Sequence, residues 1–380
     1  PLTYSISGGP DQSLFNINSS TGVLTFKTAP NFEAPGDVGT NNVYNLQVRV
    51  TDGNNPVTQD LIITVTDVNE APTGVSLTNT TPAIAENTST TNRTKVADIN
   101  ITDDALGTET ITLTGADAAS FEVDGNALYL KAGTVLNHEA KSSYTVTINV
   151  DDATVGNTPD VSTNFTLSVT NVNEAPSFAA PTATFSTPEN TTAVGTITPA
   201  TDPDAGDNLT YTLSGADAAK FNFDATSRVL SFKTAPNFEA PGSVAGTNAY
   251  SVTVTAIDTG GLTATQTVTV NVTNVNEAPS FAAPTATFST PENSTSVGTI
   301  TPATDPDAGS TLTYSLSGAD AAKFNLDTTS RVLTFKNPPN FEAPGSAAGT
   351  NAYTVTVTAT DGGGLTATQT VTVNVTDVVE

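Results

Sequence analysis

The groups in this sequence that could do chemistry are carboxylate and amide side chains that return at fixed places. A short linker motif starts with Asp or Asn and reads DVNEAP once, NVNEAP twice and DVVE at the end of the sequence. The four copies begin at Asp67, Asn171, Asn274 and Asp377, at intervals of 104, 103 and 103 residues. Oxygen atoms of this kind are ligands for hard cations when a fold gathers enough of them.

Other acidic positions recur between the linkers. A glutamate follows the first expected strand of a repeat at Glu86, Glu189 and Glu292. A mid-repeat loop holds Asn and Glu two residues apart at Asn31/Glu33, Asn137/Glu139, Asn237/Glu239 and Asn340/Glu342. An acidic pair stands at Asp103/Asp104, Asp202/Asp204 and Asp305/Asp307, and a later acid at Asp52, Asp152, Asp258 and Asp361. The linkers add Asn69, Glu70, Asn173, Glu174, Asn276, Glu277 and Glu380.

The overall charge limits the partners of this protein. In 380 residues, 38 acidic side chains face 12 basic ones, for a formal net charge of −26. Such a surface repels nucleic acids and anionic membranes and attracts cations. The sequence has no cysteine, which excludes disulfides, thiolate metal sites and thiol nucleophiles. No apolar run approaches the roughly 20 residues of a membrane span, and a secretion signal would have to lie outside this stretch.

The elements that must position the acids are expected to be strands. In AYSVTVTAI, Tyr250, Val252 and Val254 alternate with polar residues, and TQTVTVNVT alternates in the same way. A period of two predicts strands with one buried face. We expect about seven short strands per repeat, with GADAAKF as the only helical turn and Phe221 in the core. The prediction is an all-β tandem array of Greek-key sandwiches over 1–71, 72–175, 176–278 and 279–380.

The first of these repeats is incomplete. PLTYSISGG at its start matches NLTYTLSGA at 208–216, so about thirty residues and two strands of the pattern are missing. A sandwich without two strands exposes its core and a sheet edge. We therefore expect either that the chain is a window on a longer array, or that another chain supplies the strands.

Strand direction sorts the acidic loops to the two ends of each sandwich. The glutamates of PEN and NFE are expected where the chain leaves a repeat, and the acids of DPD and TDG where the next repeat begins. Any single Asp or Asn could instead be a simple turn residue. Two carboxylates about 4 Å apart repel by about 4 kcal/mol at an effective dielectric of about 20, however. Several such pairs at a junction therefore predict a bound cation, and calcium suits an all-oxygen site.

These motifs together resemble the calcium motifs of cadherin repeats. PEN, NFE, DPDAG, TDG and DVNEAP occur in the order and spacing of that family, over the whole chain, and are most similar to bacterial cadherin-like surface proteins. The resemblance implies calcium ions between successive repeats. Departures from the family pattern, such as Asn171 and Asn274 in place of the linker's first Asp, leave the number of ions open.

The resemblance also implies which residues meet at each junction. The first junction would use Asn31, Glu33, Asp67, Asn69, Glu70, Asp103, Asp104 and Asp152. The second would use Glu86, Asn137, Glu139, Asn171, Asn173, Glu174, Asp202, Asp204 and Asp258. The third would use Glu189, Asn237, Glu239, Asn274, Asn276, Glu277, Asp305, Asp307 and Asp361. Glu292, Glu342, Asp377 and Glu380 would serve a further repeat.

Other interpretations of the same residues are weaker. DPDAG begins like an EF-hand loop, but position twelve is Leu213 or Leu316, each on an expected strand. His138, the only histidine, has no catalytic context, and carboxylates at domain ends do not form a glycosidase cleft. We therefore predict that the protein is not an enzyme. Immunoglobulin-like or fibronectin-like sandwiches are the alternative fold, without the junction acids.

Two functions remain open. The array is either a calcium-rigidified adhesion or spacer segment of a large cell-surface protein, or a subunit of an extracellular fibre or sheath assembled by strand exchange. The expected location is extracellular. Expected partners are calcium ions and either other copies of the array or surface glycans and proteins, with no nucleic acid and no membrane insertion.

Overall fold

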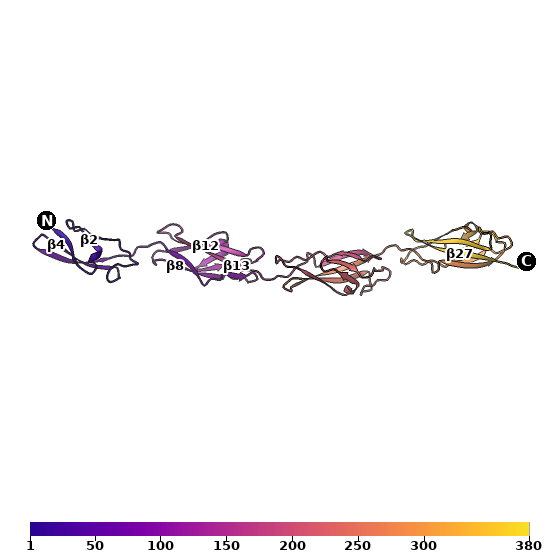
Figure 1. The fold of residues 1–380 in the computed structure, drawn as a ribbon, viewed down its shortest axis with the longest axis horizontal. Coiled ribbons are helices and arrows are strands. Elements are labelled where there is room, and N and C mark those ends of the chain that lie inside the picture. Colours follow the sequence, from indigo (N-terminus) through magenta and orange to yellow (C-terminus); the bar gives the residue numbers. More distant parts are fainter. Residues whose placement is uncertain (380) are drawn as a thin grey trace. The chain divides into compact units, whose positions relative to one another are not determined.

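The computed structural model describes residues 1–379 and is almost entirely β (Figure 1). The described residues form 27 strands and four 3-10 helices of three residues each. They divide into two compact units, 1–172 and 173–380, and each unit is described by itself. No helix in the described part of the chain has the length and hydrophobicity of a membrane span. We keep the proposed repeat boundaries as names: first (1–71), second (72–175), third (176–278) and fourth repeat (279–380).

The unit 1–172 holds thirteen strands. In the first repeat they are β1 (Thr3–Gly8), β2 (Phe15–Ile17), β3 (Leu24–Phe26), β4 (Val43–Thr51) and β5 (Pro56–Thr64), with η1 (Gln12–Leu14). In the second repeat they are β6 (Gly74–Thr78), β7 (Ala83–Ala85), β8 (Thr94–Thr102), β9 (Glu109–Thr114), β10 (Phe121–Asp124), β11 (Ala127–Leu130), β12 (Ser143–Asp152) and β13 (Val161–Thr170), with η2 (Ala118–Ser120).

The unit 173–380 holds two repeats of seven strands, as predicted. The third repeat has β14 (Thr182–Pro188), β15 (Ala193–Thr196), β16 (Thr210–Ser214), β17 (Phe221–Phe223), β18 (Val229–Phe232), β19 (Ala249–Ile257) and β20 (Thr263–Thr273), with η3 (Ala218–Lys220). The fourth repeat has β21 (Thr285–Pro291), β22 (Ser296–Thr299), β23 (Thr313–Ser317), β24 (Phe324–Leu326), β25 (Val332–Phe335), β26 (Ala352–Thr360) and β27 (Thr366–Thr376), with η4 (Ala321–Lys323).

Each full repeat is a sandwich of two sheets. In the third repeat the sheets have the orders β14-β20-β19-β16 and β15-β18-β17, and the fourth repeat has the same arrangement. The second repeat has the orders β7-β13-β12-β9 and β10-β11-β8-β6, with β6 as an eighth strand. The first repeat forms only the sheets β1-β4-β5 and β2-β3. One pairing is parallel in every full repeat, because the first or second strand runs beside the last strand (β7 with β13, β14 with β20, β21 with β27).

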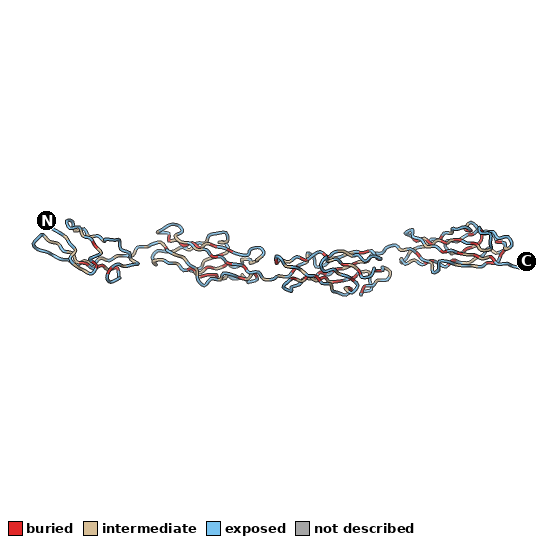
Figure 2. The backbone as a smooth tube through the Cα atoms, viewed as in Figure 1, coloured by how far each residue is buried: buried red, intermediate tan, exposed pale blue. Residues whose placement is uncertain are grey.

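The alternation predicted from the sequence decides which side chains fill the sandwich. Tyr250, Val252, Val254 and Ala256 on β19 are all buried, while the residues between them are exposed or half-buried. The tube in Figure 2 shows the same buried residues along the strands and exposed loops around them. Burying one such side chain stabilises the fold by roughly 1.5–3 kcal/mol. The predicted strand pattern of the third repeat is therefore confirmed.

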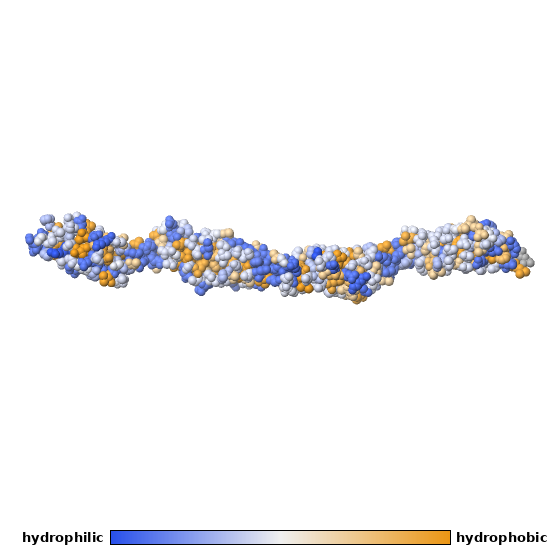
Figure 3. All heavy atoms as spheres, in the orientation of Figure 1, coloured by the Kyte–Doolittle hydropathy of each residue, from blue (hydrophilic) through white to orange (hydrophobic). Residues whose placement is uncertain are grey.

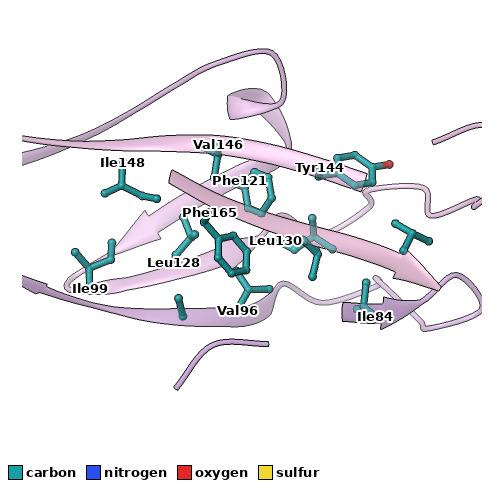
Figure 4. Packing of buried hydrophobic residues seen from close by; sticks show 13 residues of the cluster. Ile84, Val96, Ile99, Phe121, Leu128, Leu130, Tyr144, Val146, Ile148 and Phe165 are labelled. Carbon is teal, nitrogen blue, oxygen red and sulfur yellow. The ribbon is translucent and has the colours of Figure 1, made fainter. Parts of the chain in front are cut away.

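The core of the second repeat shows how the two sheets meet (Figure 4). Val146 and Ile148 point from β12 toward Leu128 and Val96 of the opposite sheet, and all four are completely buried. The predicted core phenylalanine recurs in every repeat, with Phe15, Phe121, Phe221 and Phe324 each at most 3% exposed. The face of the molecule drawn in Figure 3 carries its apolar residues in small patches broken up by polar ones. The sandwich core, rather than the surface, therefore collects the apolar side chains.

Candidate metal centre

The glutamate after the first strand is held where the chain leaves the third repeat. β14 runs parallel to β20 with Pro188 opposite Thr273, so Glu189 lies beside the start of the linker. Glu189 is 1% exposed, and its two carboxylate oxygens accept hydrogen bonds from the backbone N–H of Phe238 (2.8 Å) and of Val275 (2.9 Å). One side chain thus ties the mid-repeat loop and the linker to the end of the sandwich.

The same arrangement occurs in the other full repeats. Glu86 accepts the N–H groups of His138 and Val172 at 2.7 Å each. Glu292 accepts those of Phe341 (2.8 Å) and Val378 (3.0 Å). These N–H donors hold the pKa of Glu86 and of Glu292 below the usual value, because they stabilise the ionised form. The glutamates are therefore charged at neutral pH.

Further acids gather around Glu189 and Glu292, and no salt bridge in the described residues pairs them with a cation. In the unit 173–380, carboxylate oxygens of Glu189, Glu239 and Glu277 lie within 4.8 Å of one another, and Glu292, Glu342 and Asp377 form a similar group. Within the described residues, Glu239 Oε2 is buried without a hydrogen-bond partner. Burial raises the pKa of Glu239, and the charges of nearby acids, Glu189 first, raise it further.

The first junction lies within the unit 1–172 and has its own cluster. Carboxylate oxygens of Glu33, Asp67, Glu70 and Asp104 lie within 4.8 Å of one another. Burial raises the pKa of Glu70, and the neighbouring charges of Glu33, Asp104 and Asp67 raise it further. Asp103 lies beside Glu109; burial raises its pKa, as do the negative charges of Glu109 and Asp104. Packing like charges together in this way favours a cation.

Linker residues also reach the acids at the start of a repeat. The backbone N–H of Glu70, Glu174 and Glu277 donates to Asp104 (3.0 Å), Asp204 (2.8 Å) and Asp307 (2.7 Å), respectively. The amide Nδ2 of Asn69, Asn173 and Asn276 donates to Asp152 (2.8 Å), Asp258 (2.9 Å) and Asp361 (2.9 Å). Asn274 Nδ2 donates to Asp307 Oδ1 at 2.8 Å.

A glycine leaves room for the linker asparagine. A Cβ on Gly363 would lie 2.6 Å from Asn276 Cγ, and one on Gly260 would lie 2.5 Å from Asn173 Cγ. Real Cβ atoms do not approach other heavy atoms this closely, so any other residue would push the asparagine away. The glycines that follow the strand-end acids are therefore part of the site.

The acidic pair of the third repeat keeps two buried oxygens without a hydrogen-bond partner in the described residues, as Asp103 does in the second repeat. Asp202 Oδ1 accepts the N–H of Asp204 at 3.0 Å, but Asp202 Oδ2 and Asp204 Oδ1 are buried without a partner in the described residues. Asp204 is 7% exposed. Leaving a buried charged oxygen without a partner is costly, so this pair fits a cation ligand better than a turn.

The buried Asp258 nearby is ionised. Burial raises its pKa, but hydrogen bonds from Asn173 and from the backbone N–H of Leu262 outweigh this and hold it below the usual value. Asp258 Oδ2 is the atom that meets Asn173. A charged aspartate therefore faces the linker amide.

The mid-loop asparagines are placed differently from the acids. The Oδ1 atoms of Asn31, Asn137, Asn237 and Asn340 each accept the N–H three residues ahead, at 2.9, 2.5, 2.5 and 2.6 Å. These oxygens shape their own loop, and their role as ligands stays a prediction. Asn171 is exposed at the end of its unit. The predicted ligands of the second junction fall on both units, and Glu380 lies outside the described residues.

The motifs did not single out two further aspartates of the third repeat, of which only Asp207 belongs to an acid cluster. Asp207 has a carboxylate oxygen within 4.8 Å of those of Asp202 and Asp258. Asp217, in GADAAKF, is 3% exposed, and its oxygens accept the N–H groups of Val244 and Ser251 at 2.7 Å each. The difference between GDN in the third repeat and GST in the fourth could have pointed to Asp207. Nothing in the sequence showed the partners of Asp217.

Comparison with known proteins identifies the kind of chain that carries these clusters. The family model for the cadherin domain matches residues 286–376, and that for a bacterial Ig domain matches residues 173–271. Protocadherin-11 X-linked from Sus scrofa is 29% identical over 97% of this chain. The chain is a cadherin-like tandem-repeat protein.

The other likenesses of this cadherin-like protein extend over the whole described fold. Human Protocadherin Fat 4 is 27% identical over 98% of the chain. The chain spans only 33% of the length of Protocadherin-11 X-linked from Sus scrofa and 8% of human Fat 4. These relatives are protocadherins rather than enzymes, in agreement with the prediction that the chain is not an enzyme.

Solved structures show the same fold. The Protocadherin GammaB4 extracellular domain matches with a TM-score of 0.67 and 23% identity, over 99% of this chain and 61% of that one. The Protocadherin gammaB7 EC3-6 cis-dimer structure matches with a TM-score of 0.67 and 22% identity, over 98% of this chain and 93% of that one. The predicted sandwich array is therefore confirmed at the level of the fold.

Proposed function

We propose that this cadherin-like array is an extracellular adhesion or spacer segment of a large surface protein and that calcium ions stiffen it at the repeat ends. The observation that carries the proposal is the set of buried carboxylate oxygens without partners in the described residues, above all Asp202 Oδ2, Asp204 Oδ1 and Glu239 Oε2. The ligand atoms that these sites offer to a metal are all oxygen atoms, of carboxylates, amides and backbone carbonyls. Calcium prefers such a ligand set.

The cation would act by cancelling repulsion. Each acid cluster brings three or four carboxylates within 4.8 Å of one another. Pairs at about 4 Å repel by about 4 kcal/mol at an effective dielectric of about 20. A divalent ion held by Asp202, Asp204 and Asp258, or by Glu189, Glu239 and Glu277, would replace this repulsion by attraction and fix the linker residues that contribute ligands.

The similarity to the Protocadherin GammaB4 extracellular domain supports an extracellular location for this chain. The net charge of −26 agrees with a chain that attracts divalent cations such as calcium. Contacts with other copies of the array, or with surface proteins, are proposed as its adhesive partners. The alternative of a fibre subunit assembled by strand exchange stays a prediction.

Small-angle scattering and calorimetry of the chain with calcium and with EDTA test the proposal. We expect chelation to broaden the distribution of the radius of gyration and to lower the melting temperature. Binding at 100 times the dissociation constant stabilises a fold by about 2.7 kcal/mol per site. Identical scattering and melting curves in both conditions would contradict calcium stiffening.

A further inference from the structure

The third and fourth repeats have nearly the same sequence but differ at one position of the acidic loop. ATDPDAGDNLTY at 200–211 becomes ATDPDAGSTLTY at 303–314, so Ser310 stands where the third repeat has Asp207. The loop itself does not change: the N–H of Asp207 donates to the carbonyl of Asp204 (3.2 Å), and that of Ser310 to the carbonyl of Asp307 (3.1 Å). The two residues therefore present different groups from the same turn.

The hydroxyl in the fourth repeat gives Asp305 Oδ2 a hydrogen-bond partner that Asp202 Oδ2 lacks among the described residues of the third repeat. Ser310 Oγ donates to Asp305 Oδ2 at 2.9 Å, and the two oxygens of Asp307 accept hydrogen bonds from the linker groups Asn274 Nδ2 and Glu277 N–H. In the third repeat Asp207 cannot donate a proton when ionised. Asp202 Oδ2, Asp204 Oδ1 and Asp207 Oδ2 are all buried without a partner in the part of the chain that the structure describes.

The acids of the third repeat also share one cavity. Asp202, Asp204 and Asp207 line a cavity of about 380 Å³, together with Tyr211 and Arg228. Asp207 Oδ1 accepts a hydrogen bond from Thr259 Oγ1 at 2.5 Å, which fixes the carboxylate, and the fourth repeat has Gly362 in place of Thr259. The side chain of Asp204, more than nine-tenths buried, contributes its unpaired oxygen to this cavity.

The nearby arginine does not neutralise the cluster. The guanidinium of Arg228 lies 5.7 Å from the ring of Tyr211 and donates from Nη1 to the carbonyl of Thr226 at 3.3 Å. None of the salt bridges in the described residues joins Arg228 to Asp202, Asp204 or Asp207. The third repeat therefore has one more negative charge than the fourth at this place, and no salt bridge among the described residues pairs it.

We propose that Asp207 is an additional ligand for a divalent cation at the start of the third repeat and that this site binds calcium more tightly than its counterpart in the fourth repeat. The inference rests on the proposed calcium function of the repeat ends. It adds that the calcium sites at these ends differ in affinity. Calcium affinity follows the number of charged ligands. As calcium is titrated, the third-repeat site fills before the fourth-repeat site.

Exchange of the two residues tests this proposal in the full chain. We expect Asp207→Ser to weaken the tightest class of calcium binding, measured by titration calorimetry, by about tenfold. The reciprocal change, Ser310→Asp with Gly362→Thr, should create a second tight site. A Cβ at Gly362 meets nothing within 4 Å, so the threonine can be accommodated. Asp60→Ser is the matched control for loss of one charge, because Asp60 is exposed and its side chain accepts a hydrogen bond from Gln47 at the surface.

Thermal unfolding provides a second readout with a change of sign. In EDTA, Asp207→Ser should raise the melting temperature of its transition, because it removes a repelling charge and supplies a hydroxyl donor to Asp202. In millimolar calcium the same variant should lower it, because a ligand is lost. This reversal also shows that the variant folds.

The outcomes separate the two proposals. Wild-type calcium binding that Asp207→Ser leaves unchanged would overturn the role of Asp207 and leave the calcium function standing. A wild-type chain that does not bind calcium at millimolar concentration would overturn both. A loss of affinity in Asp60→Ser equal to that in Asp207→Ser would reduce the effect to overall charge and overturn the assignment of a specific ligand.

Discussion

Buried aspartates occur in two regions of the third repeat, and they are satisfied to different degrees. Asp217, directly before η3, has both oxygens paired with backbone N–H groups of Val244 and Ser251. Asp202 and Asp204, at the end of the sandwich, each keep a buried oxygen without a partner in the described chain. Burial alone therefore does not mark a ligand. A buried carboxylate oxygen that lacks a hydrogen-bond partner is the stronger sign of a ligand, because a folded protein rarely leaves such an oxygen unpaired.

The comparison predicts that, of these aspartates, Asp217 contributes most to the stability of the fold. Asp217→Ala leaves two backbone N–H groups without acceptors, at about 1–3 kcal/mol each. We expect a loss of about 2–6 kcal/mol in the free energy of unfolding of the third repeat, equal in calcium and in EDTA, measured by denaturant unfolding. Asp60→Ala is the control for charge. A loss that calcium restores would mean that Asp217 belongs to the metal site.

Acids at the repeat ends such as Glu239 and Asp305, unlike Asp217, should stabilise the fold only when calcium is bound. Glu239→Ala combined with Asp305→Ala removes one acid from each side of the third junction. We expect the repeats to stay folded in EDTA and the calcium-dependent stabilisation to fall by about 2–3 kcal/mol, as for the loss of a site filled at 100 times its dissociation constant. Calorimetry with and without calcium measures this. Loss of folding in EDTA would assign these acids a structural role like that of Asp217.

Glycine next to the strand-end acid allows a finer test. Gly363→Ala places a Cβ 2.6 Å from Asn276 Cγ and should displace the amide from Asp361. The expected cost is about 0.5–1 kcal/mol of calcium-dependent stabilisation, the net value of one hydrogen bond. Gly362→Ala is a matched control, because its Cβ meets nothing within 4 Å. If Gly363→Ala and Gly362→Ala reduced the calcium-dependent stabilisation equally, Asn276 would have no role in the site.

The smallest expected effect is on pH dependence. The pKa of Glu70 and of Glu239 is raised in the folded chain, so the folded state binds more protons than the unfolded state just above their ordinary pKa. In EDTA the chain should therefore gain stability as pH falls from 7 toward 5. Below about pH 4 it should lose stability, because the pKa of Glu86 and of Asp258 is lowered and their contribution disappears as they are protonated.

Calcium should remove the gain at mildly acidic pH. Protons and the cation compete for the same oxygens, so the calcium-loaded chain should only lose stability as the pH falls. Melting temperatures measured across pH 7 to 4 in both conditions check this. A gain of the same size in calcium would show that these groups do not bind the ion.

Much of the fold could be predicted from the sequence because it depends on local pattern. The alternation around Val252 and Val254 and the recurrence of Phe221 are properties of single segments, and the structure confirms both. The position of Glu189 beside the linker also follows from strand direction alone. What could not be predicted is which oxygens are already paired. That depends on N–H groups such as those of Val244 and Ser251, 27 and 34 residues from Asp217 along the chain.

Equilibrium dialysis of the full chain against millimolar calcium, followed by metal analysis, tests the central claim most directly. We predict saturable binding of more than one ion per chain, and fewer ions bound by a variant with Asp204→Asn and Asp258→Asn. A chain that retains no calcium above the level of a charge-matched control protein would contradict the account.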